Sequence, residues 1–298
     1  MADQAERLRA IVQGQRDMGS SRPKGASRTI VVASGKGGVG KTNLVINMAL
    51  TMGQLGRKTM ILDADLGMAN VDILLDLKPV YTLIDVMSGK KELQEVILRG
   101  PYNLEVLPGG SCIPEIINMD TRQREQLISR LSYLENEVDI LFIDCSAGIS
   151  RNVLSFIAAA DDLVLITTPE PTAITDVYSV IKIVDKYCMH ASVGLIVNMV
   201  GSMREGEQIF DRIARVCHNF LNLKLTHVGS VDFDQHVQKA VINCSPYVLQ
   251  YPRSRAAQAT QQIARHLLGV DTAKLSGRKE NGFVRRLFQR WVGETAER

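Results

Sequence analysis

A glycine-rich segment, SGKGGVGKT at residues 34–42, constrains the fold of this chain more than any other feature. It follows the apolar run IVVA, which is typical of a buried strand, and it precedes a stretch with helical spacing that ends near Gln54. Glycines let backbone N–H groups close around phosphate oxygens, and the start of a helix adds its positive end. We expect Lys41 to reach the β- and γ-phosphates of a nucleotide and Thr42 to hold Mg²⁺. The segment predicts a strand, loop and helix that bind ATP or ADP.

The rest of the chain repeats the alternation of apolar strands and helical stretches. Strands that are apolar throughout and separated by helices are typical of a parallel sheet that is covered on both faces. We therefore predict an α/β protein with the three-layer P-loop NTPase fold, in which a mostly parallel sheet carries helices on both faces. The domain is expected to span residues 29–270. The further expected strands are residues 60–62, 104–107, 139–144, 163–167, 193–197 and 228–231.

Composition narrows the class of protein. Hydrophobic residues make up 45% of the 298 residues, so a sizeable core is available, and the net charge of +3 indicates no particular partner. No apolar run reaches the roughly 18 residues of a membrane-spanning helix. The polar start is unlike a secretory signal, so we expect a cytoplasmic protein. The five cysteines form no CxxC pair, which argues against disulfides and tight metal clusters and suggests small buried side chains.

Three aspartates follow predicted strands. Asp63 and Asp65 end the second strand, and Asp144 ends the fourth, DILFID. Ligand sites of parallel sheets lie beyond the carboxyl ends of the strands, so all three should face the glycine-rich loop. A nucleotide hydrolase needs carboxylates for Mg²⁺ and for the attacking water. We expect Asp144 to act on Mg²⁺ through water, with Asp63 in the same shell. The alternative is that these aspartates cap helices or lie in solvated turns.

A second lysine, Lys36, is not needed by an ordinary P-loop. With it, the loop resembles the deviant Walker A family, which includes MinD, ParA and the nitrogenase iron protein. That resemblance implies that Lys36 crosses a dimer interface to the partner's nucleotide, so that ATP drives homodimer formation. It implies catalytic roles for Lys36, Lys41 and Asp65, the last of which would orient the attacking water. The implied nucleotide-binding residues are Gly35, Lys36, Gly37, Gly38, Val39, Gly40, Lys41 and Thr42.

The same resemblance extends to two later positions and to two loops. Asn198 aligns with the family's adenine-contacting asparagine, and Asp232 falls in the segment that lines the base. The alternative for both is a turn-forming residue at a strand end. The segments 65–72 and 145–151 would be switch loops that sense the γ-phosphate.

The segments before and after the domain, residues 1–28 and 271–298, indicate which branch of the family the chain resembles. Residues 63–72 match the MinD pattern D-x-D-x-G-x-x-N-x-D, but residues 1–28 precede the first strand as a short helix and a linker. The motif DQAxxLR in this segment resembles the activator motif of the FlhG group (also FleN or YlxH), which regulates flagellar number and placement. The resemblance implies stimulation of an FlhF-type GTPase and contact with flagellar C-ring proteins; the alternative is a solvated tail. The implied partner-binding residues are Asp3, Gln4, Ala5, Leu8 and Arg9.

The last segment, residues 271–298, is expected to be a polar linker and an amphipathic helix. GFVRRLFQRWVG at 282–293 places bulky apolar residues on one helical face and Arg285, Arg286, Gln289 and Arg290 on the other. Such a helix suits the surface of an anionic lipid membrane. The alternative is a helix docked on the protein's own core, and both can hold if docking occurs only in the monomer. The predicted membrane-facing residues are Phe283, Val284, Leu287, Phe288, Trp291 and Val292.

These features favour a MinD-like ATPase of the FlhG type, which works as a homodimer on the cytoplasmic face of the membrane. One alternative is a ParA-type DNA-partitioning ATPase. The basic cluster lies on an aromatic-rich tail rather than on the core, so we expect no nucleic acid partner. A second alternative is an iron–sulfur carrier or redox enzyme, for which Cys145 stands near the switch segment. A third is a nucleotide-bound scaffold with negligible turnover.

Overall fold

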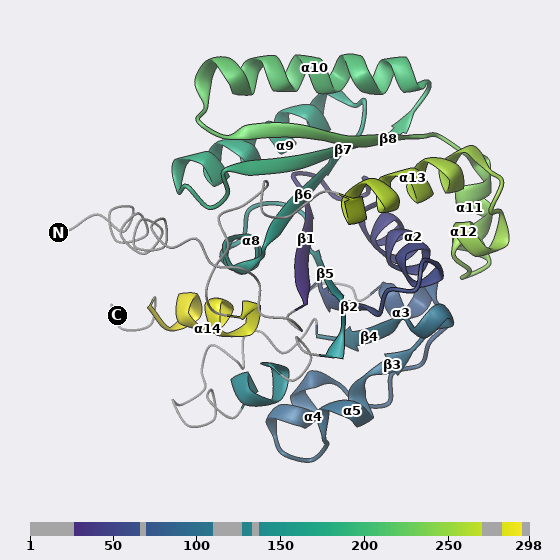
Figure 1. Ribbon diagram of the computed structural model, residues 1–298, viewed down its shortest axis with the longest axis vertical. Helices are drawn as coiled ribbons and strands as arrows, with labels where there is room; N and C mark the ends of the chain where they lie inside the picture. Colours follow the sequence, from purple (N-terminus) through teal and green to yellow (C-terminus); the bar gives the residue numbers. More distant parts are fainter. Residues whose placement is uncertain (1–26, 66–69, 110–126, 133–136, 270–281, 294–298) are drawn as a thin grey trace.

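The structure is a computed structural model that describes residues 27–65, 70–109, 127–132, 137–269 and 282–293. Its centre is an eight-stranded sheet with the order β3-β4-β2-β5-β1-β6-β7-β8 (Figure 1). All neighbouring strands run parallel except β3 and β4. The strands are β1 (Arg28–Ser34), β2 (Thr59–Ala64), β3 (Leu98–Arg99), β4 (Glu105–Pro108), β5 (Ile140–Cys145), β6 (Asp162–Thr167), β7 (Ser192–Val200) and β8 (Lys224–Asp232).

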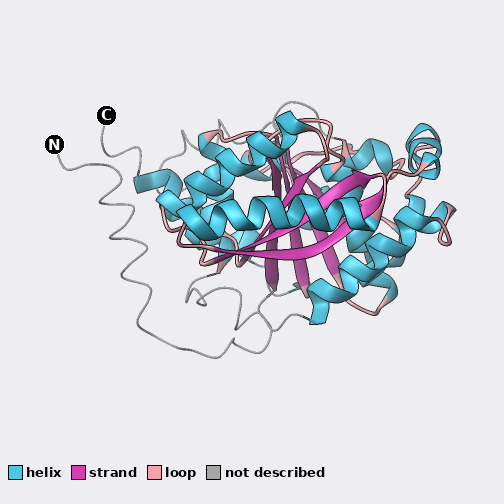
Figure 2. Cartoon of the chain, turned by 90° about the horizontal axis from the view of Figure 1, so that it is seen from above, coloured by secondary structure: helices cyan, strands magenta, loops and turns pink. Residues whose placement is uncertain are grey.

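Helices cover both faces of the sheet, and the view in Figure 2 shows them on either side of the strands. One layer contains α4 (Leu83–Met87), α5 (Leu93–Val96), α8 (Arg151–Ala159), α9 (Pro171–Lys186), α10 (Met203–Phe220) and α14 (Phe283–Gly293). The other contains α2 (Lys41–Gln54), α3 (Val71–Leu74), α11 (Gln235–Ile242), α12 (Tyr247–Gln250) and α13 (Arg255–Gly269). A short 3₁₀ turn, Pro101–Asn103, precedes β4.

The alternation of side chains along the central strand explains the two layers. Val31 and Ala33 of β1 pack into the core under one layer, and Ile30 and Val32 pack into the core under the other. All four side chains are fully buried. Because successive strand residues point to opposite faces, a strand that is apolar throughout has to be covered on both sides. The predicted three-layer fold is confirmed.

The topology places a ligand site at the carboxyl end of β1. This strand lies between β5 and β6, with Val32 beside Asp144 in the parallel register. Asp63 of β2 is in turn the register partner of Asp144. The chain goes from β1 to β2 on one side, and later from β5 to β6 on the other. Such a switch point is where parallel sheets bind their ligands.

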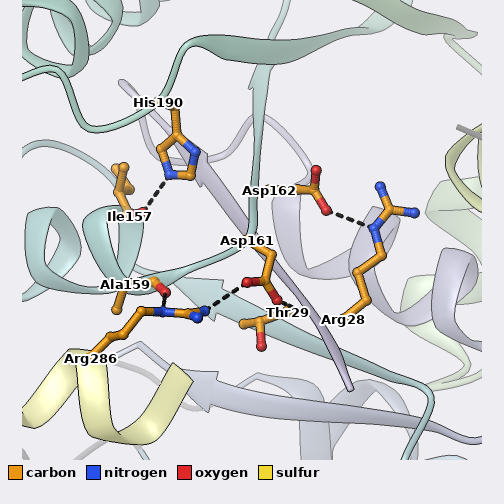
Figure 3. A network of polar contacts seen from close by, with 8 residues as sticks. All are labelled: Arg28, Thr29, Ile157, Ala159, Asp161, Asp162, His190 and Arg286. Carbon is orange, nitrogen blue, oxygen red and sulfur yellow. Dashed lines mark hydrogen bonds and ion pairs between the residues drawn. The ribbon is translucent and has the colours of Figure 1, made fainter. Parts of the chain in front are cut away.

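The amino ends of β1 and β6 are joined by a polar network, drawn in Figure 3. Arg28 Nε donates to Asp162 Oδ2 at 2.7 Å, with both side chains 7% exposed. Arg28 Nη1 also donates to the carbonyl of Leu267 near the end of α13. The backbone N–H of Thr29 donates to Asp161 Oδ2 at 2.9 Å. The network anchors the first strand of the domain at the end opposite the ligand site.

The described residues correct some sequence-based expectations and leave others untested. All seven predicted strands are present, but the short antiparallel β3 was not predicted. Cys145 and Cys217 are buried as expected, whereas Cys188 is exposed, so that expectation is wrong for Cys188. The predicted N-terminal helix and most of the linker, residues 1–26, lie outside the described residues. The predicted linker end at residue 28 was wrong, because Arg28 is buried and begins β1. Within the described part of the chain, no helix has both the length and the apolar character to span a membrane.

Candidate nucleotide-binding site

The loop between β1 and α2 has the conformation that its glycines predict. Gly38 and Gly40 have φ angles of 77° and 86°, a backbone region that side-chain-bearing residues rarely adopt. A Cβ atom on Gly40 would also lie 2.5 Å from Asn198 Nδ2. Gly40 immediately precedes α2, so the loop delivers the free N–H groups of the first helical turn to a bound anion. The conformation of the loop therefore depends on glycine at these positions.

Neighbouring elements hold the loop in place. Ser34 Oγ donates to the carbonyl of Lys36 at 2.8 Å, and the N–H of Gly148 donates to the carbonyl of Ser34 at 2.9 Å. The second bond ties the predicted switch segment after β5 directly to the loop. On the other side, Asn198 Nδ2 donates to the carbonyl of Val39 at 2.8 Å. The individual roles of Ser34 and Gly148 were not predicted, because no sequence pattern marks a hydrogen bond within a loop.

Lys41, Thr42 and Asp144 form the centre of the site. Lys41 is 8% exposed and Asp144 is 1% exposed. Burial raises the pKa of Asp144 to about 7; the charge of Lys41 and a hydrogen bond from Thr42 oppose this shift, whereas Asp63 and Asp65 add to it. Asp144 Oδ1 is buried and has no hydrogen-bond partner among the described residues. A buried oxygen of this kind suits a cation or its bound water.

Magnesium therefore fits this group of residues. Thr42 and Asp144 would hold Mg²⁺ together with the nucleotide phosphates, because hydroxyl and carboxylate oxygens are the ligands that this ion prefers. When bound, the ion neutralises charge that develops on the phosphates. Lys41, buried beside Asp144, supplies a fixed positive charge to the same phosphates without having to move through water.

Asp63 has a different environment from the one expected of a metal ligand. Its Oδ1 accepts the N–H of Asp65 at 3.2 Å, and its Oδ2 accepts those of Asn70 and Val71 at 3.2 and 3.3 Å. Burial raises its pKa, and these three hydrogen bonds oppose the shift. Asp63 thus anchors both ends of the loop that contains residues 66–69, which lie outside the described residues. Its role in holding Mg²⁺ stays a prediction.

Asp65 follows β2 directly and is half-buried. Its charge contributes to the raised pKa of Asp144, so it belongs to the same group of acids. The three aspartates singled out in the sequence therefore meet at the carboxyl edge of the sheet, as predicted. The backbone N–H of Asp65 donates to Asp63 Oδ1, so the main chain of Asp65 is held at the end of β2. That placement suits the predicted orientation of an attacking water, which stays a prediction.

The two residues predicted to lie near the base are placed differently. Asn198 is 7% exposed and contacts the loop through its amide, so it comes next to the nucleotide site. Asp232 ends β8 beside Val200 in the register. The next residue, Phe233, donates its N–H to Val200 and leaves 56% of its surface exposed. This exposed aromatic residue was missed, and its only sequence signal is an apolar residue between two acids.

Cys145 does not have the surroundings of a reactive or metal-binding thiol. It is 1% exposed, and burial raises its pKa above the ordinary value, with the charge of Asp144 acting in the same direction. A thiol that resists ionisation is a poor nucleophile and a poor metal ligand. Among the described residues, no group of three or more His, Cys, Asp or Glu side chains is arranged to hold a metal ion.

The C-terminal helix α14 lies against α8. Its residues Phe283, Val284, Leu287 and Phe288 are all at most 5% exposed, and the rings of Phe156 and Phe283 are stacked with centroids 6.4 Å apart. The placement of Arg286 on the polar face was wrong, because this residue is only 5% exposed. The side chains of Trp291 and Val292 lie outside the described residues, as do Asp3, Gln4, Ala5, Leu8 and Arg9.

Two hydrogen bonds explain the burial of Arg286 (Figure 3). Its Nε donates to the carbonyl of Ala159, the last residue of α8, at 2.6 Å. Its Nη2 donates to Asp161 Oδ1 at 2.7 Å. The spacing Phe283, Arg286, Leu287 follows one helical stripe, so the guanidinium lies on the apolar face and is buried because it is paired. We call these two bonds the Arg286 latch.

The loop, the buried lysine and the carboxylates at the edge of a parallel sheet define a P-loop nucleotide hydrolase. The ParA family, described as "NUBPL iron-transfer P-loop NTPase", matches residues 25–268. The chain is 38% identical over 277 residues to the antiactivator FleN of Pseudomonas aeruginosa, covering 92% of this chain and 97% of that protein. It is 31% identical over 295 residues to the flagellum site-determining protein YlxH of Helicobacter pylori, covering 97% and 99%.

A solved structure gives the same result for the fold. The septum site-determining protein MinD with Mg-ADP from Pyrococcus horikoshii superposes with a TM-score of 0.65 at 29% identity, covering 83% of this chain and 99% of that one. The chain therefore belongs to the ParA family of P-loop NTPases, in its MinD-like part. It is an ATPase, and its cofactors are ATP or ADP and Mg²⁺.

Proposed function

We propose that this chain is a MinD-like ATPase of the FlhG group, which regulates the number and placement of flagella. One observation carries the proposal. The flagellar relative FleN is 38% identical to this chain over 92% of its length, and YlxH aligns with 97% of it, whereas the septum site-determining protein MinD of Synechocystis is 31% identical over 90%. In the P-loop fold the ATPase domain supplies a switch, and segments outside it determine what the switch controls.

The switch itself is proposed to be an ATP-dependent homodimer. Two lysines of the loop differ in surroundings: Lys41 is 8% exposed, whereas the side chain of Lys36 is 40% exposed. The buried lysine serves the nucleotide of its own subunit. The exposed one lies at the rim, from which it can reach the phosphates of a second subunit. Hydrolysis then removes the γ-phosphate and separates the subunits.

Membrane binding is proposed to alternate with docking of α14. The four buried apolar residues of this helix are the same ones that the sequence predicts to face lipid, so the two states exclude each other. Helix α8, on which α14 docks, begins at the last residue of the switch segment and is capped by Ser150 of that segment. A change in that segment on ATP binding would shift α8 and weaken the docking. Two released helices in a dimer hold anionic lipid more strongly than one, because the second binds at a high effective concentration.

Liposome sedimentation tests this proposal. The full chain is mixed with vesicles containing anionic lipid, in ADP and in ATP, beside a variant that lacks residues 282–298. We expect ATP-dependent sedimentation that the truncated variant loses. The same preparations are mixed with double-stranded DNA. Protein that ignores vesicles but coats DNA in ATP would replace the proposal with a DNA-partitioning ATPase.

The flagellar assignment is tested separately through the N-terminus. Residues Asp3 to Arg9 are proposed to stimulate an FlhF-type GTPase at the cytoplasmic face of the membrane, and C-ring proteins are proposed as further partners. The GTP turnover of such an enzyme is measured with the full chain, with Gln4→Ala and with the matched control Gln13→Ala. Stimulation that Gln4→Ala alone reduces is expected. Equal turnover with and without the chain would refute this part.

A further inference from the structure

The exposed lysine of the nucleotide loop is held by the beginning of α9. Lys36 Nζ donates to Glu170 Oε2 at 2.5 Å and to Thr172 Oγ1 at 3.0 Å. Glu170 directly precedes the helix, and Thr172 lies in its first turn, with Pro171 between them. Two residues that follow β6 therefore bind the ammonium group of a residue that follows β1.

The backbone around Lys36 is fixed to the same helix. A Cβ atom on Gly35 would lie 2.3 Å from the carbonyl carbon of Asp176, so the loop and the second turn of α9 are in direct backbone contact. The carbonyl of Lys36 itself accepts the hydroxyl of Ser34 at 2.8 Å. The side chain of Lys36 thus leaves the loop from a fixed point beside α9, and Glu170 and Thr172 fix its far end.

The contact is nevertheless easy to exchange. The side chains of Lys36 and Glu170 are 40% and 62% exposed, so water screens the pair, and exposed ion pairs of this kind contribute little to stability. A buried pair would be costly to separate, since each charge would be left without a partner. Glu170 also contributes no side-chain cap to α9 in the described structure. Its carboxylate can therefore lose Lys36 without loss of the helix.

We infer that Glu170 and Thr172 are positioning residues that hold Lys36 within its own subunit until the phosphates of a second subunit replace them. The inference rests on the proposed function, in which Lys36 contacts the partner's nucleotide. The carboxylate of Glu170 competes with that nucleotide for the same ammonium group. It also places a negative charge where the partner's phosphates arrive. Glu170 thereby raises the ATP concentration that dimer formation requires.

The test is an ATP titration of dimer formation, followed by light scattering, with the full chain and Mg²⁺. Glu170→Gln keeps the shape and removes the charge. We expect it to lower the ATP concentration at half-maximal dimer formation by about two- to fivefold, the range that an exposed pair allows. Glu170→Asp retains the charge and should behave more like the wild type. Thr172→Val should give a smaller shift in the direction of Glu170→Gln.

The matched control is Glu95→Gln, which breaks the exposed pair between Lys91 and Glu95, 2.8 Å apart, away from the nucleotide loop. Dimer formation that needs more ATP in Glu170→Gln would overturn the inference, since the carboxylate would then support Lys36 in the dimer. A shift no larger than that of the control would also overturn it. Different results would contradict the proposed function: a wild type that forms no ATP-dependent dimer, or a Lys36→Ala variant that dimerises as the wild type does.

Discussion

Charged side chains are arranged differently at the carboxyl and the amino ends of the central strands. At the carboxyl end, Asp63, Asp65 and Asp144 meet beside one buried lysine, and Asp144 keeps an oxygen without a hydrogen-bond partner in the described part of the chain. At the amino end, Arg28 pairs with Asp162, and Arg286 pairs with Asp161, each at 2.7 Å.

The difference separates a ligand site from structural contacts. An excess of buried negative charge destabilises a fold unless a cation binds, so the aspartates at the carboxyl end suit Mg²⁺ and a nucleotide. At the amino end, each of the two aspartates is paired with an arginine, and these pairs join neighbouring elements of the fold. The Arg286 latch differs from the Arg28 pair in one respect: it holds a helix outside the sheet, α14, whose release the proposed function requires.

The largest expected effect is on ATP hydrolysis, when Asp65 of the nucleotide site is replaced. Asp65→Ala should reduce ATP hydrolysis by about a hundredfold or more, since the attacking water loses its orienting group. ATP binding should persist, because the loop and Lys41 are unchanged. Phosphate release and bound nucleotide are measured together. Unchanged hydrolysis would favour the nucleotide-bound scaffold.

The shape of the loop gives the next effect. Gly40→Ala forces a side chain into a left-handed conformation at φ 86° and against the amide of Asn198. We expect the free energy of unfolding to fall by about 2–3 kcal/mol in urea without nucleotide. The matched control is Gly37→Ala, where a Cβ meets no atom within 4 Å, and it should change stability by less than about 0.5 kcal/mol. An equal fall in the free energy of unfolding in both variants would contradict a loop conformation that requires glycine at position 40.

The Arg286 latch is tested by comparing two arginines of one helix. Arg286→Gln removes two hydrogen bonds from a charged group, each of which contributes about 1.5–3 kcal/mol, whereas Arg285 is exposed. Each variant loses one positive charge, so attraction to lipid falls equally in both. In ADP, Arg286→Gln should bind anionic vesicles about tenfold better than Arg285→Gln. Equal binding would show that the latch does not hold the helix.

The last prediction concerns the pH dependence of stability. The pKa of Asp144 is raised from 3.8 to about 7, so between these values the folded state binds more protons than the unfolded state. The contribution of this group to stability therefore falls as pH rises through that window, by at most about 1.4 kcal/mol per pH unit. Asp63 shifts in the same direction. Without nucleotide, Asp144→Asn should flatten the decrease measured by urea unfolding from pH 5 to 7. An identical slope in both proteins would contradict the shift.

The sequence predicted what depends on local chemistry and missed what depends on tertiary contacts. Residues 34–42 specify their loop because the glycines and the flanking strand and helix admit few conformations. The face of α14 was misread at Arg286, because charge suggested solvent while helical spacing places the residue with Phe283 and Leu287. The contact between Lys36 and Glu170 joins segments that only the sheet brings together. The hydrogen bonds of Asp63 are local, to backbone N–H groups of the loop that follows it, but no sequence pattern marks them. The two-residue β3 carries too short a pattern to be recognised.

The central claim is that Lys36 makes ATP a link between two subunits. Gel filtration with light scattering, in ADP and in ATP with Mg²⁺, measures it directly on the wild type and on Lys36→Ala. We predict a monomer in ADP, a dimer in ATP, and a monomer in both nucleotides for Lys36→Ala. A single oligomeric state that neither the nucleotide nor the substitution changes would contradict the account.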